Sequence, residues 1–202
     1  MRKEQDFYFH KAKKENYPAR SVYKLEEAQK KHKFLKRRQR VLDLGCHPGS
    51  WSLYAAKIIG SSGIVVGVDI QPTDIPAQTD QAEIHWLCYD VYADELVAEL
   101  RKHWPGFHVL ISDMAPATTG SRFADHQQSL RLVRRAMELA GLLLHENGSL
   151  YCKVFQGEDF PTFLQECKPL FADIKVIKPQ SSRNESREVF VLGSGFRRKA
   201  GG

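Results

Sequence analysis

The sequence predicts an α/β protein whose mostly parallel sheet is covered by helices on both faces. Short apolar runs of strand length alternate with longer stretches of helical periodicity, and strands separated by helices form βαβ units with parallel strands. The first run, residues 41–44, ends in a turn bounded by Gly45 and Gly49 and passes into an apolar helix. Ligands of open α/β sheets bind at the carboxyl ends of strands, so this turn is a candidate binding site.

Two segments precede that strand. Residues 1–18 are polar and basic and contain four aromatic residues. This composition predicts a segment that is weakly ordered without a partner, and its rings can pack locally or stack on bases. From residue 20 to about 33, Val22, Leu25 and Ala28 recur at helical spacing, which predicts an amphipathic helix.

The glycine turn favours a nucleoside ligand without a pyrophosphate. A dinucleotide site needs a glycine in the middle of G-x-G-x-x-G, and here His47 stands at that position. The next apolar run, residues 64–68, ends at Asp69, 24 residues after the first glycine of the turn. A carboxylate near that spacing binds ribose hydroxyls, so Asp69 is the candidate ribose ligand. Ser50 is placed to cap the helix predicted for residues 51–59.

The rest of the chain continues the alternation. Strands are predicted at residues 84–88, 107–112, 149–155, 174–177 and 189–192. Helices are predicted at residues 93–103, 125–144 and 159–171. Residues 104–106 (Trp-Pro-Gly) and 147–148 (Asn-Gly) are predicted to end the first two of these helices, because such residues close a helix. The connection over residues 71–82 is long.

Composition favours one domain with a localised basic surface. With 202 residues, 42% of them apolar, the chain is long enough for one substantial core and short for two, so we expect one domain over residues 1–202. The first 40 residues hold 14 Lys or Arg against 5 Asp or Glu, and the tail at 195–202 is also basic. Such asymmetry favours a polyanion, usually nucleic acid, over the alternative of a solvated basic helix.

Cysteine usage and the lack of long apolar stretches favour a cytoplasmic location. Cys46, Cys88, Cys152 and Cys167 are scattered without metal-ligand spacing, which predicts reduced core residues and no metal site. No apolar stretch of about 18 residues occurs, so no membrane insertion is expected. The N-terminus is charged, which argues against an export signal.

Polar residues follow the predicted strands at the end where a crevice is expected. Asp43 and Asp69 come from the first two strands, Asp90 follows the third, and Asp113 ends the fourth. Lys153 lies inside the fifth strand, where an unpaired ammonium is costly to bury. The alternative is an edge strand with this lysine in solvent. We favour a functional lysine, because buried lysines are rare and mark functional sites.

Asp113 and Glu188 are candidate partners for Lys153, and Lys24 completes a cluster of four charges. Five segments stand out in the chain: 19–25 (ARSVYKL), 41–51 (VLDLGCHPGSW), 112–116 (SDMAP), 153–158 (KVFQGE) and 181–190 (SSRNESREVF). In this order and together with the four charges, they resemble the FtsJ/RrmJ family of RNA 2'-O-ribose methyltransferases. The resemblance covers nearly the whole chain and implies one FtsJ-type domain.

The resemblance implies a seven-stranded sheet whose last strand is antiparallel, and S-adenosylmethionine as cofactor. The family's catalytic tetrad falls on Lys24, Asp113, Lys153 and Glu188. The cofactor-binding positions are Gly45, Gly49, Trp51, Asp69, Asp90 and Asp113. Cys46, His47 and Ser50 depart from the alanine pair and the glycines common in bacterial members, which bears on cofactor affinity.

Other chemistries fit these residues less well. A methyltransferase for exocyclic amines needs an Asn/Asp-Pro-Pro-aromatic motif after the fourth strand, where this chain has Asp-Met-Ala-Pro at residues 113–116. A carbon-5 pyrimidine methyltransferase needs a cysteine nucleophile, but strand alternation points Cys152 and Lys153 to opposite faces. A non-catalytic RNA-binding module would show a broken tetrad. An NAD oxidoreductase would need the missing central glycine.

The expected reaction is attack of a ribose 2'-hydroxyl of RNA on the sulfonium methyl group, without a metal. Lys153 either accepts the hydroxyl proton or stabilises the oxyanion, and both roles stay open at this stage. Asp113 is expected to orient Lys153 and to contact the cofactor's methionine end. The resemblance favours a uridine in large-subunit ribosomal RNA and a monomeric enzyme. Transfer RNA and the messenger cap are alternative substrates.

The RNA is expected to lie across the basic N-terminal helix. Phosphate contacts are predicted at Arg20, Lys30, Lys31, Lys33, Lys36, Arg37 and Arg38. Arg183, beside Ser181 and Ser182, is predicted to contact the target nucleotide. The target ribose must be flipped out or unpaired, because its hydroxyl has to reach a recessed site.

Overall fold

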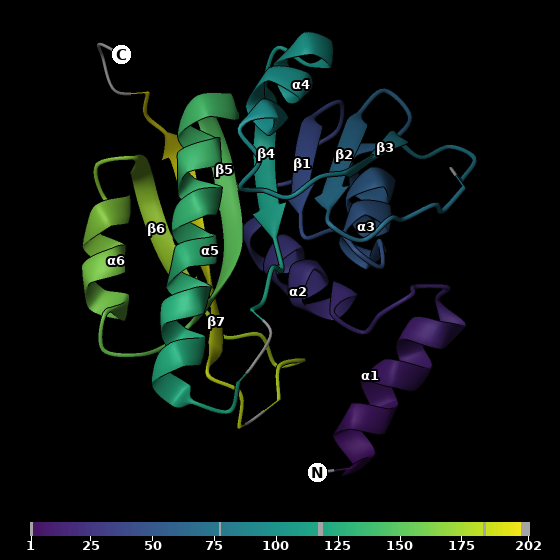
Figure 1. The fold of residues 1–202 in the computed structure, drawn as a ribbon. Coiled ribbons are helices and arrows are strands. Elements are labelled where there is room, and N and C mark those ends of the chain that lie inside the picture. The colour runs from purple at the N-terminus through teal and green to yellow at the C-terminus, as the bar shows by residue number, and fades with distance from the viewer. Residues whose placement is uncertain (1, 77, 117–118, 184, 199–202) are drawn as a thin grey trace.

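The computed structural model describes residues 2–76, 78–116, 119–183 and 185–198, which form a seven-stranded sheet with helices on both faces (Figure 1). The strands are β1 (Arg40–Leu44), β2 (Ile64–Asp69), β3 (Glu83–Cys88), β4 (Phe107–Ser112), β5 (Leu144–Phe155), β6 (Phe171–Ile177) and β7 (Glu188–Phe196). The helices are α1 (Arg2–Lys14), α2 (Val22–His32), α3 (Ser50–Ile59), α4 (Glu95–His103), α5 (Arg122–Leu143) and α6 (Phe160–Cys167). The predicted fold class is confirmed.

The strand order is β3-β2-β1-β4-β5-β7-β6. The pairs among β1 to β5 are parallel, whereas β7 runs antiparallel to both β5 and β6. The order reverses between β1 and β4, whose last residues Leu44 and Ser112 are register partners. Chains leave these two strands in opposite directions, so a crevice is expected at their carboxyl ends.

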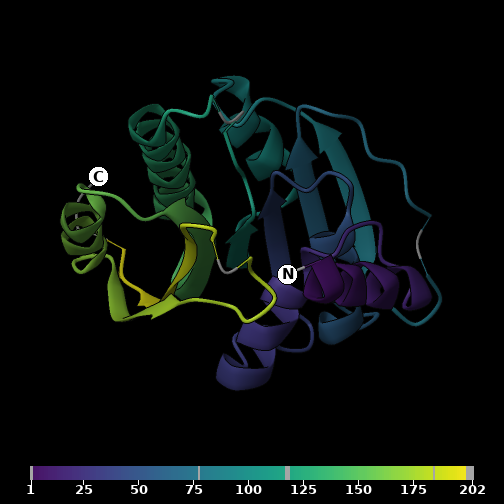
Figure 2. The same cartoon turned by 90° about the horizontal axis from the view of Figure 1, so that it is seen from below.

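Each face of the sheet has its own apolar core, because side chains alternate along a strand. Leu42 and Leu44 of β1 lie in the core under α4, α5 and α6, and Val41 lies in the core under α2 and α3. Seen from below, α5 and α6 lie on one side of the sheet and α1 and α2 on the other (Figure 2). Burial on both faces explains why the central strands read as nearly continuous apolar runs.

Helix α1 lies in the N-terminal segment, for which no element was expected. Its last turns pack on the domain: Ala12 is buried, and the rings of Tyr8 and Tyr23 lie 5.3 Å apart. Lys11 Nζ lies 4.1 Å from the centroid of the Tyr23 ring and 3.5 Å from Glu26 Oε2. The sequence did not predict this helix because few of its described side chains pack against the domain and the segment is otherwise polar.

The predicted Ser50 cap is wrong. Helix α3 begins at Ser50 itself, and Gly49 occupies the preceding cap position with φ 104°. The Ser50 hydroxyl instead accepts a hydrogen bond from the backbone N of Ala19 at 2.7 Å. It therefore ties the segment before α2 to the start of α3.

The Asn147-Gly148 pair does not end a helix. α5 stops at Leu143 and β5 begins at the next residue, so the pair lies inside the strand. Asn147 has φ 63°, and the β4–β5 register shifts between Phe107 and Val109. The pair therefore lies at a strand irregularity. Such an irregularity, like the end of a helix, can require a residue in the left-handed conformation.

Other differences are smaller. α6 ends at Cys167 rather than residue 171, and β7 extends to Phe196, so it includes the first residues of the expected tail. Residues 199–202 of that tail lie outside the described part. The cysteines are free and three are buried as expected, but Cys88 is exposed. Among the described residues, no helix is both long and apolar enough to cross a membrane.

Candidate active site

A cavity of about 400 Å³ lies at the carboxyl ends of the central strands. We call it the acidic cavity, because Asp69, Asp90 and Asp113 line it and none of its described lining residues is Lys or Arg. Gly45 and His47 also line it. Five residues singled out by sequence therefore meet here. Asp69 and Asp90 form no ion pair with a described Lys or Arg, which suits a cationic ligand and disfavours a pyrophosphate.

The wall of the acidic cavity is built by backbone as well as side chains. Gly45 has φ 75°, and a Cβ there would lie 2.5 Å from Met114 Cγ, so only glycine fits. Asp69 holds two loops together, since Oδ2 accepts from the backbone N of His47 at 3.0 Å and Oδ1 from that of Gln71 at 2.9 Å. Each carboxylate oxygen keeps a lone pair for a ligand hydroxyl.

Two predicted cofactor residues are not part of this cavity wall. A Cβ on Gly49 would lie 2.7 Å from Ile75 Cδ1, so this glycine allows the residue 70–82 connection to approach. Trp51 is buried, its ring stacks 5.6 Å from that of Tyr151, and its Nε1 donates to Ser21 O at 2.9 Å. Trp51 therefore belongs to an aromatic cluster with Tyr151 and Phe190, and the ring of Phe190 lies 5.7 Å from Lys24 Nζ.

The four residues of the predicted tetrad form a chain of ion pairs. Lys153 Nζ lies 2.9 Å from Asp113 Oδ1 and also donates to Asp113 O at 2.6 Å. Lys24 Nζ lies 3.9 Å from the same Asp113 oxygen and 2.9 Å from Glu188 Oε1. The four residues come from β5, the end of β4, α2 and the start of β7. Positive and negative groups alternate along this chain, so each largely buried charge has a neighbour of opposite sign.

The surroundings keep Glu188 ionised. Burial alone would raise its pKa, but Lys24 and the more distant Lys153 together lower the pKa below its ordinary value. The side chain of Lys153 is only 7% exposed. The predicted lysine in the middle of a strand is therefore buried and paired, as its functional interpretation required.

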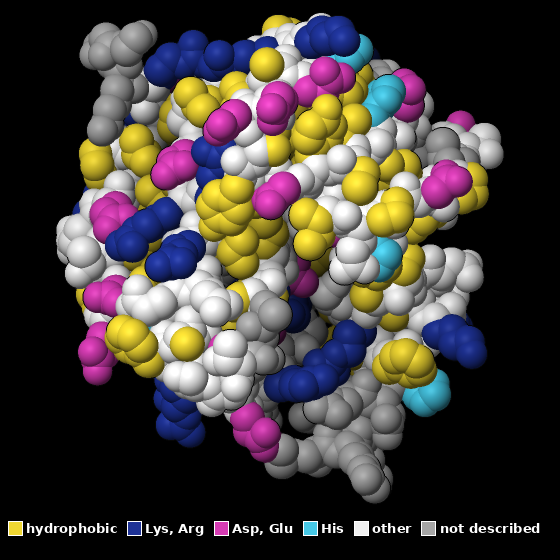
Figure 3. All heavy atoms as spheres, in the orientation of Figure 1, with side chains coloured by type: hydrophobic (Ala, Val, Ile, Leu, Met, Phe, Trp, Pro, Cys, Tyr) yellow, Lys and Arg dark blue, Asp and Glu magenta, His cyan; other side chains and the backbone are white. Residues whose placement is uncertain are grey.

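A second cavity of about 440 Å³ lies beside the tetrad, and we call it the basic cavity. Arg20, Lys24 and Arg183 line it, together with Glu185, Ser186 and Glu188. The space-filling view shows this end of the molecule hollowed, with Lys or Arg side chains along the hollow (Figure 3). Asp113 lines the acidic cavity and Lys24 lines the basic cavity, so the ion-pair chain joins the two.

Comparison with known proteins gives this arrangement a family. The model of the FtsJ-like methyltransferases matches residues 17–196. The chain belongs to this family. It is 54% identical over 198 residues to ribosomal RNA large subunit methyltransferase E of Desulfotalea psychrophila, with 98% of each chain covered. It is 45% identical to the protein of the same name in Brachyspira hyodysenteriae, with 98% of this chain and 99% of the relative covered.

A solved structure shows the same fold. A protein of Plasmodium falciparum described as a ribosomal RNA methyltransferase matches with a TM-score of 0.78 at 22% identity, over 89% of this chain and 98% of that one. FtsJ-like methyltransferases use S-adenosylmethionine, so this chain is an S-adenosylmethionine-dependent methyltransferase. The acidic cavity fits this cofactor, because its sulfonium and ammonium groups are cationic and its ribose hydroxyls need a carboxylate such as Asp69.

Two further residues of this FtsJ-like enzyme were missed by sequence reasoning. Glu27 of α2 accepts hydrogen bonds from the backbone N of Gln180 at 2.7 Å and of Ser181 at 3.0 Å. Lys178 donates to the backbone oxygens of Ser186 and Glu188. Glu27 lies three residues after Lys24, on the same side of the helix. One face of α2 thus holds both the loop before β7 and the carboxylate of Glu188.

We expect Glu27→Ala to impair RNA use without changing cofactor binding. Without the carboxylate, the loop that carries Arg183 loses two charge-assisted hydrogen bonds, so the basic cavity loses its shape. The KM for RNA should rise about tenfold or more. Glu26→Ala is the matched control, since Glu26 pairs with Lys11 and Lys30 on another side of α2. Faster hydrogen exchange at Gln180 and Ser181 should accompany the change, and an unaltered KM contradicts it.

Asp43 lies behind the acidic cavity and carries an unusual charge state. Its side chain is buried, Oδ2 accepts from Ser52 Oγ at 2.6 Å, and Oδ1 has no hydrogen-bond partner among the described residues. Burial raises the pKa of Asp43 to about 7, with Asp113 and Asp69 adding to the effect. A neutral carboxyl is favoured there, because an unpaired buried charge is costly.

Because the pKa of Asp43 is raised, the free energy of unfolding should depend on pH, and Asp43→Asn should remove this group's part of that dependence. Between pH 4 and 7 the folded protein holds a proton on Asp43 that the unfolded chain has lost, so this group's contribution to stability falls as pH rises. Asparagine is neutral throughout. Urea unfolding at pH 5 and pH 8 should therefore show a larger loss of unfolding free energy in the unsubstituted protein than in Asp43→Asn. Equal losses would contradict the prediction.

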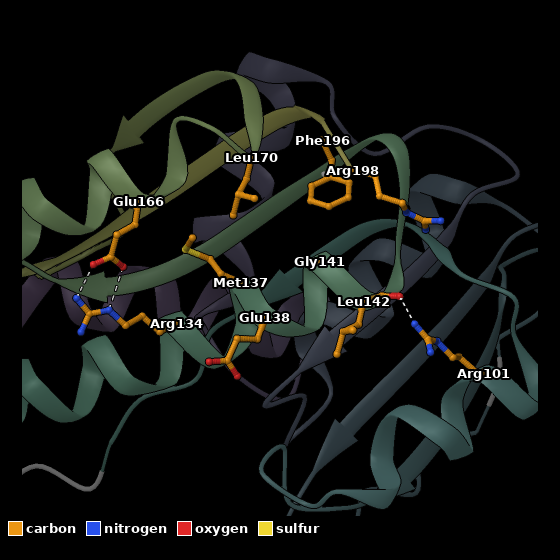
Figure 4. Close-up of a pocket in the computed structure, with 10 residues that line it drawn as sticks. All are labelled: Arg101, Arg134, Met137, Glu138, Gly141, Leu142, Glu166, Leu170, Phe196 and Arg198. Atoms are coloured by element: carbon orange, nitrogen blue, oxygen red, sulfur yellow. Dashed lines mark hydrogen bonds and ion pairs between the residues drawn. The ribbon is translucent and has the colours of Figure 1, made fainter. Parts of the chain in front are cut away.

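A larger cavity lies elsewhere in the described structure. It measures about 690 Å³ and is lined by residues of α4, α5 and α6 and by Phe196 and Arg198 (Figure 4). Its Arg134 donates to both carboxylate oxygens of Glu166, and Arg101 donates to Leu142 O. These contacts leave no reactive cluster there. Volume alone therefore does not identify the site of this enzyme.

The cysteine-nucleophile alternative fails on geometry. Cys152 is buried in the core under α5, whereas Lys153 faces the tetrad on the other side of the sheet. Burial raises the pKa of the Cys152 thiol well above its ordinary value. A buried thiol of that kind cannot supply the thiolate that attacks a pyrimidine.

Proposed function

We propose that this protein methylates the 2'-hydroxyl of a ribose in large-subunit ribosomal RNA, at a uridine. The two relatives that cover almost the whole chain are both named ribosomal RNA large subunit methyltransferases. One observation carries the chemistry. The chain Lys153–Asp113–Lys24–Glu188 joins an acidic cavity, suited to a cationic cofactor, to a basic cavity, suited to a phosphate-bearing nucleotide.

When bound, S-adenosylmethionine supplies an activated methyl group on a sulfonium centre. The protein's task is to place a weakly acidic hydroxyl in line with that methyl and to handle its proton. Lys153 is the proposed catalytic residue, because Asp113 fixes its Nζ through two contacts. Lys24 pairs with Asp113 and Glu188 pairs with Lys24, so that the Nζ atom of Lys153 is preorganised toward the developing oxyanion.

The RNA side of the proposal rests on cations around the basic cavity. Arg20 and Arg183 line it from opposite segments, which suits the phosphates that flank one flipped nucleotide. The remaining predicted phosphate contacts, from Lys30 to Arg38, continue along α2 and the turn that follows it. We therefore propose that RNA approaches across α2.

Both cavities are built by this chain alone, so we propose a single-domain enzyme that acts as a monomer. A ribosomal substrate would place it in the cytoplasm. Transfer RNA and the messenger cap are the competing substrates.

The test is incubation of the protein with labelled S-adenosylmethionine and large ribosomal subunits, naked ribosomal RNA or transfer RNA, followed by alkaline digestion. A 2'-O-methyl group blocks cleavage of the adjoining linkage, so a labelled alkali-resistant dinucleotide from ribosomal RNA is expected. A label confined to transfer RNA overturns the substrate, and an alkali-labile label overturns ribose methylation.

A further inference from the structure

A pocket at the opposite end of the sheet has no role in the proposed reaction. It measures about 440 Å³ and lies at the amino ends of β4 and β5, against the end of α2 and the turn that follows it. We call it the amino-end pocket. Its lining includes Lys33, Lys36, His108, His145, Ser149 and Ser194. Ammonium groups, imidazoles and hydroxyls together form a donor-rich surface.

Arg40 carries a positive charge and contacts two histidines of this pocket, His108 and His145. The Arg40 guanidinium donates to Gly106 O at 2.7 Å and to His145 Nε2 at 2.8 Å, and it pairs with no carboxylate in the described ranges. His108 Nδ1 accepts from the backbone N of Arg40 at 3.0 Å. Since a guanidinium only donates, His145 Nε2 must be the acceptor, which fixes its tautomer.

The electrostatic field in the pocket is positive. Burial lowers the pKa of both His108 and His145, and Arg40 lowers it further in each case. Lys33 and Lys36 are exposed and form no ion pair with a described carboxylate. The one carboxylate in the described lining, Glu146, offsets only one of the positive charges of Lys33, Lys36 and Arg40. The unsatisfied partner for this pocket is an anion.

Helix α2 connects this pocket to the reaction site. Lys24, near its beginning, belongs to the tetrad, and Lys33, the residue after its last turn, lines the amino-end pocket. Nine residues of helix span about 13 Å. A nucleic-acid strand in a duplex advances about 3.4 Å per nucleotide, so roughly three to five nucleotides cover the distance.

We propose that the amino-end pocket binds a backbone phosphate of the RNA substrate, roughly three to five nucleotides from the methylated ribose. The inference rests on the proposed function and adds a second fixed point to it. One phosphate at the tetrad end and one at the far end of α2 would set the direction of the strand across the helix. Phosphate contacts position a nucleic acid without reading its sequence.

The test compares two double variants with equal charge change. Lys33→Glu/Lys36→Glu alters the amino-end pocket, and Lys102→Glu/Lys168→Glu is the control on α4 and after α6, on the other face of the sheet. The pocket variant should bind its ribosomal RNA at least tenfold more weakly than the control, with a salt slope smaller by about one for each phosphate lost.

Ethylation interference locates the phosphate. With the unsubstituted protein, one sensitive phosphate should appear three to five nucleotides from the methylated ribose and should disappear in the pocket variant. Equal RNA affinity in the two variants, or no sensitive phosphate in that window, overturns the proposal. Inorganic phosphate that shifts the assigned His108 and His145 ring signals without any RNA effect would also overturn it, in favour of a free-anion site. Lack of methylation by the unsubstituted protein would instead count against the proposed function.

Discussion

Lys153→Ala should lower single-turnover methyl transfer by roughly 100-fold or more, because it removes the group placed to accept the hydroxyl proton or stabilise the oxyanion. The fold should survive. The substitution relieves burial of an ammonium, and Asp113 keeps Lys24 at 3.9 Å as a partner. Cofactor affinity should also be retained, since Lys153 is not part of the acidic cavity's wall. Lys175→Ala on β6, where the side chain is 48% exposed, is the matched control.

Lys153→Arg separates the two roles of this residue. Arginine keeps the positive charge but cannot accept a proton. Substantial retained rate would favour electrostatic stabilisation, and a loss equal to that of alanine would favour the base. The measurement is methyl transfer on bound RNA in a single turnover, with calorimetric S-adenosylmethionine binding as the check on integrity. Near-normal rates in both variants would remove Lys153 from the mechanism.

The fold was predictable where a strand is buried on both faces. β4 is such a strand, and its predicted bounds, residues 107–112, match the observed ones. α1 was not predictable in this way, because only a few contacts near Ala12 hold an otherwise polar helix. Asn147 has the left-handed conformation that can end a helix, but here it lies at a strand irregularity instead. Local patterns therefore identified the conformation there but not the element.

In the candidate site, too, some residues could be predicted from the sequence and others could not. The carboxylates at strand ends could be predicted, because parallel strands bring their carboxyl ends to one edge. Glu27 could not, since its partners are backbone N–H groups of the distant residues Gln180 and Ser181, which carry no side-chain signature. Trp51 was predicted from its motif position to bind the cofactor; the structure places its ring in the core beside Tyr151, and its role toward the cofactor stays a prediction. Where the side chains of these residues lie depends on how distant segments pack together, which a local sequence pattern does not show.

Asp69→Ala should weaken S-adenosylmethionine binding in the absence of RNA by about 1.5–3 kcal/mol, the usual worth of hydrogen bonds to a charged group. This corresponds to roughly 10- to 150-fold in Kd. The structure adds a second reason for the loss. Asp69 also accepts from the backbone N of His47 and of Gln71, so its removal loosens two loops that form the cavity wall. Asp74→Ala, an exposed aspartate in the same connection, is the control.

Asp69→Asn makes the prediction sharper. An asparagine has one acceptor oxygen and one donor nitrogen in place of two acceptor oxygens. Its oxygen can serve the backbone N–H of His47 or of Gln71, and its NH₂ group then faces the other N–H, which is left without an acceptor. Calorimetry should therefore show a loss close to that of alanine despite the similar shape. Unchanged affinity in Asp69→Ala would place the cofactor's ribose elsewhere, and full affinity in Asp69→Asn would show that the two backbone contacts do not shape the cavity.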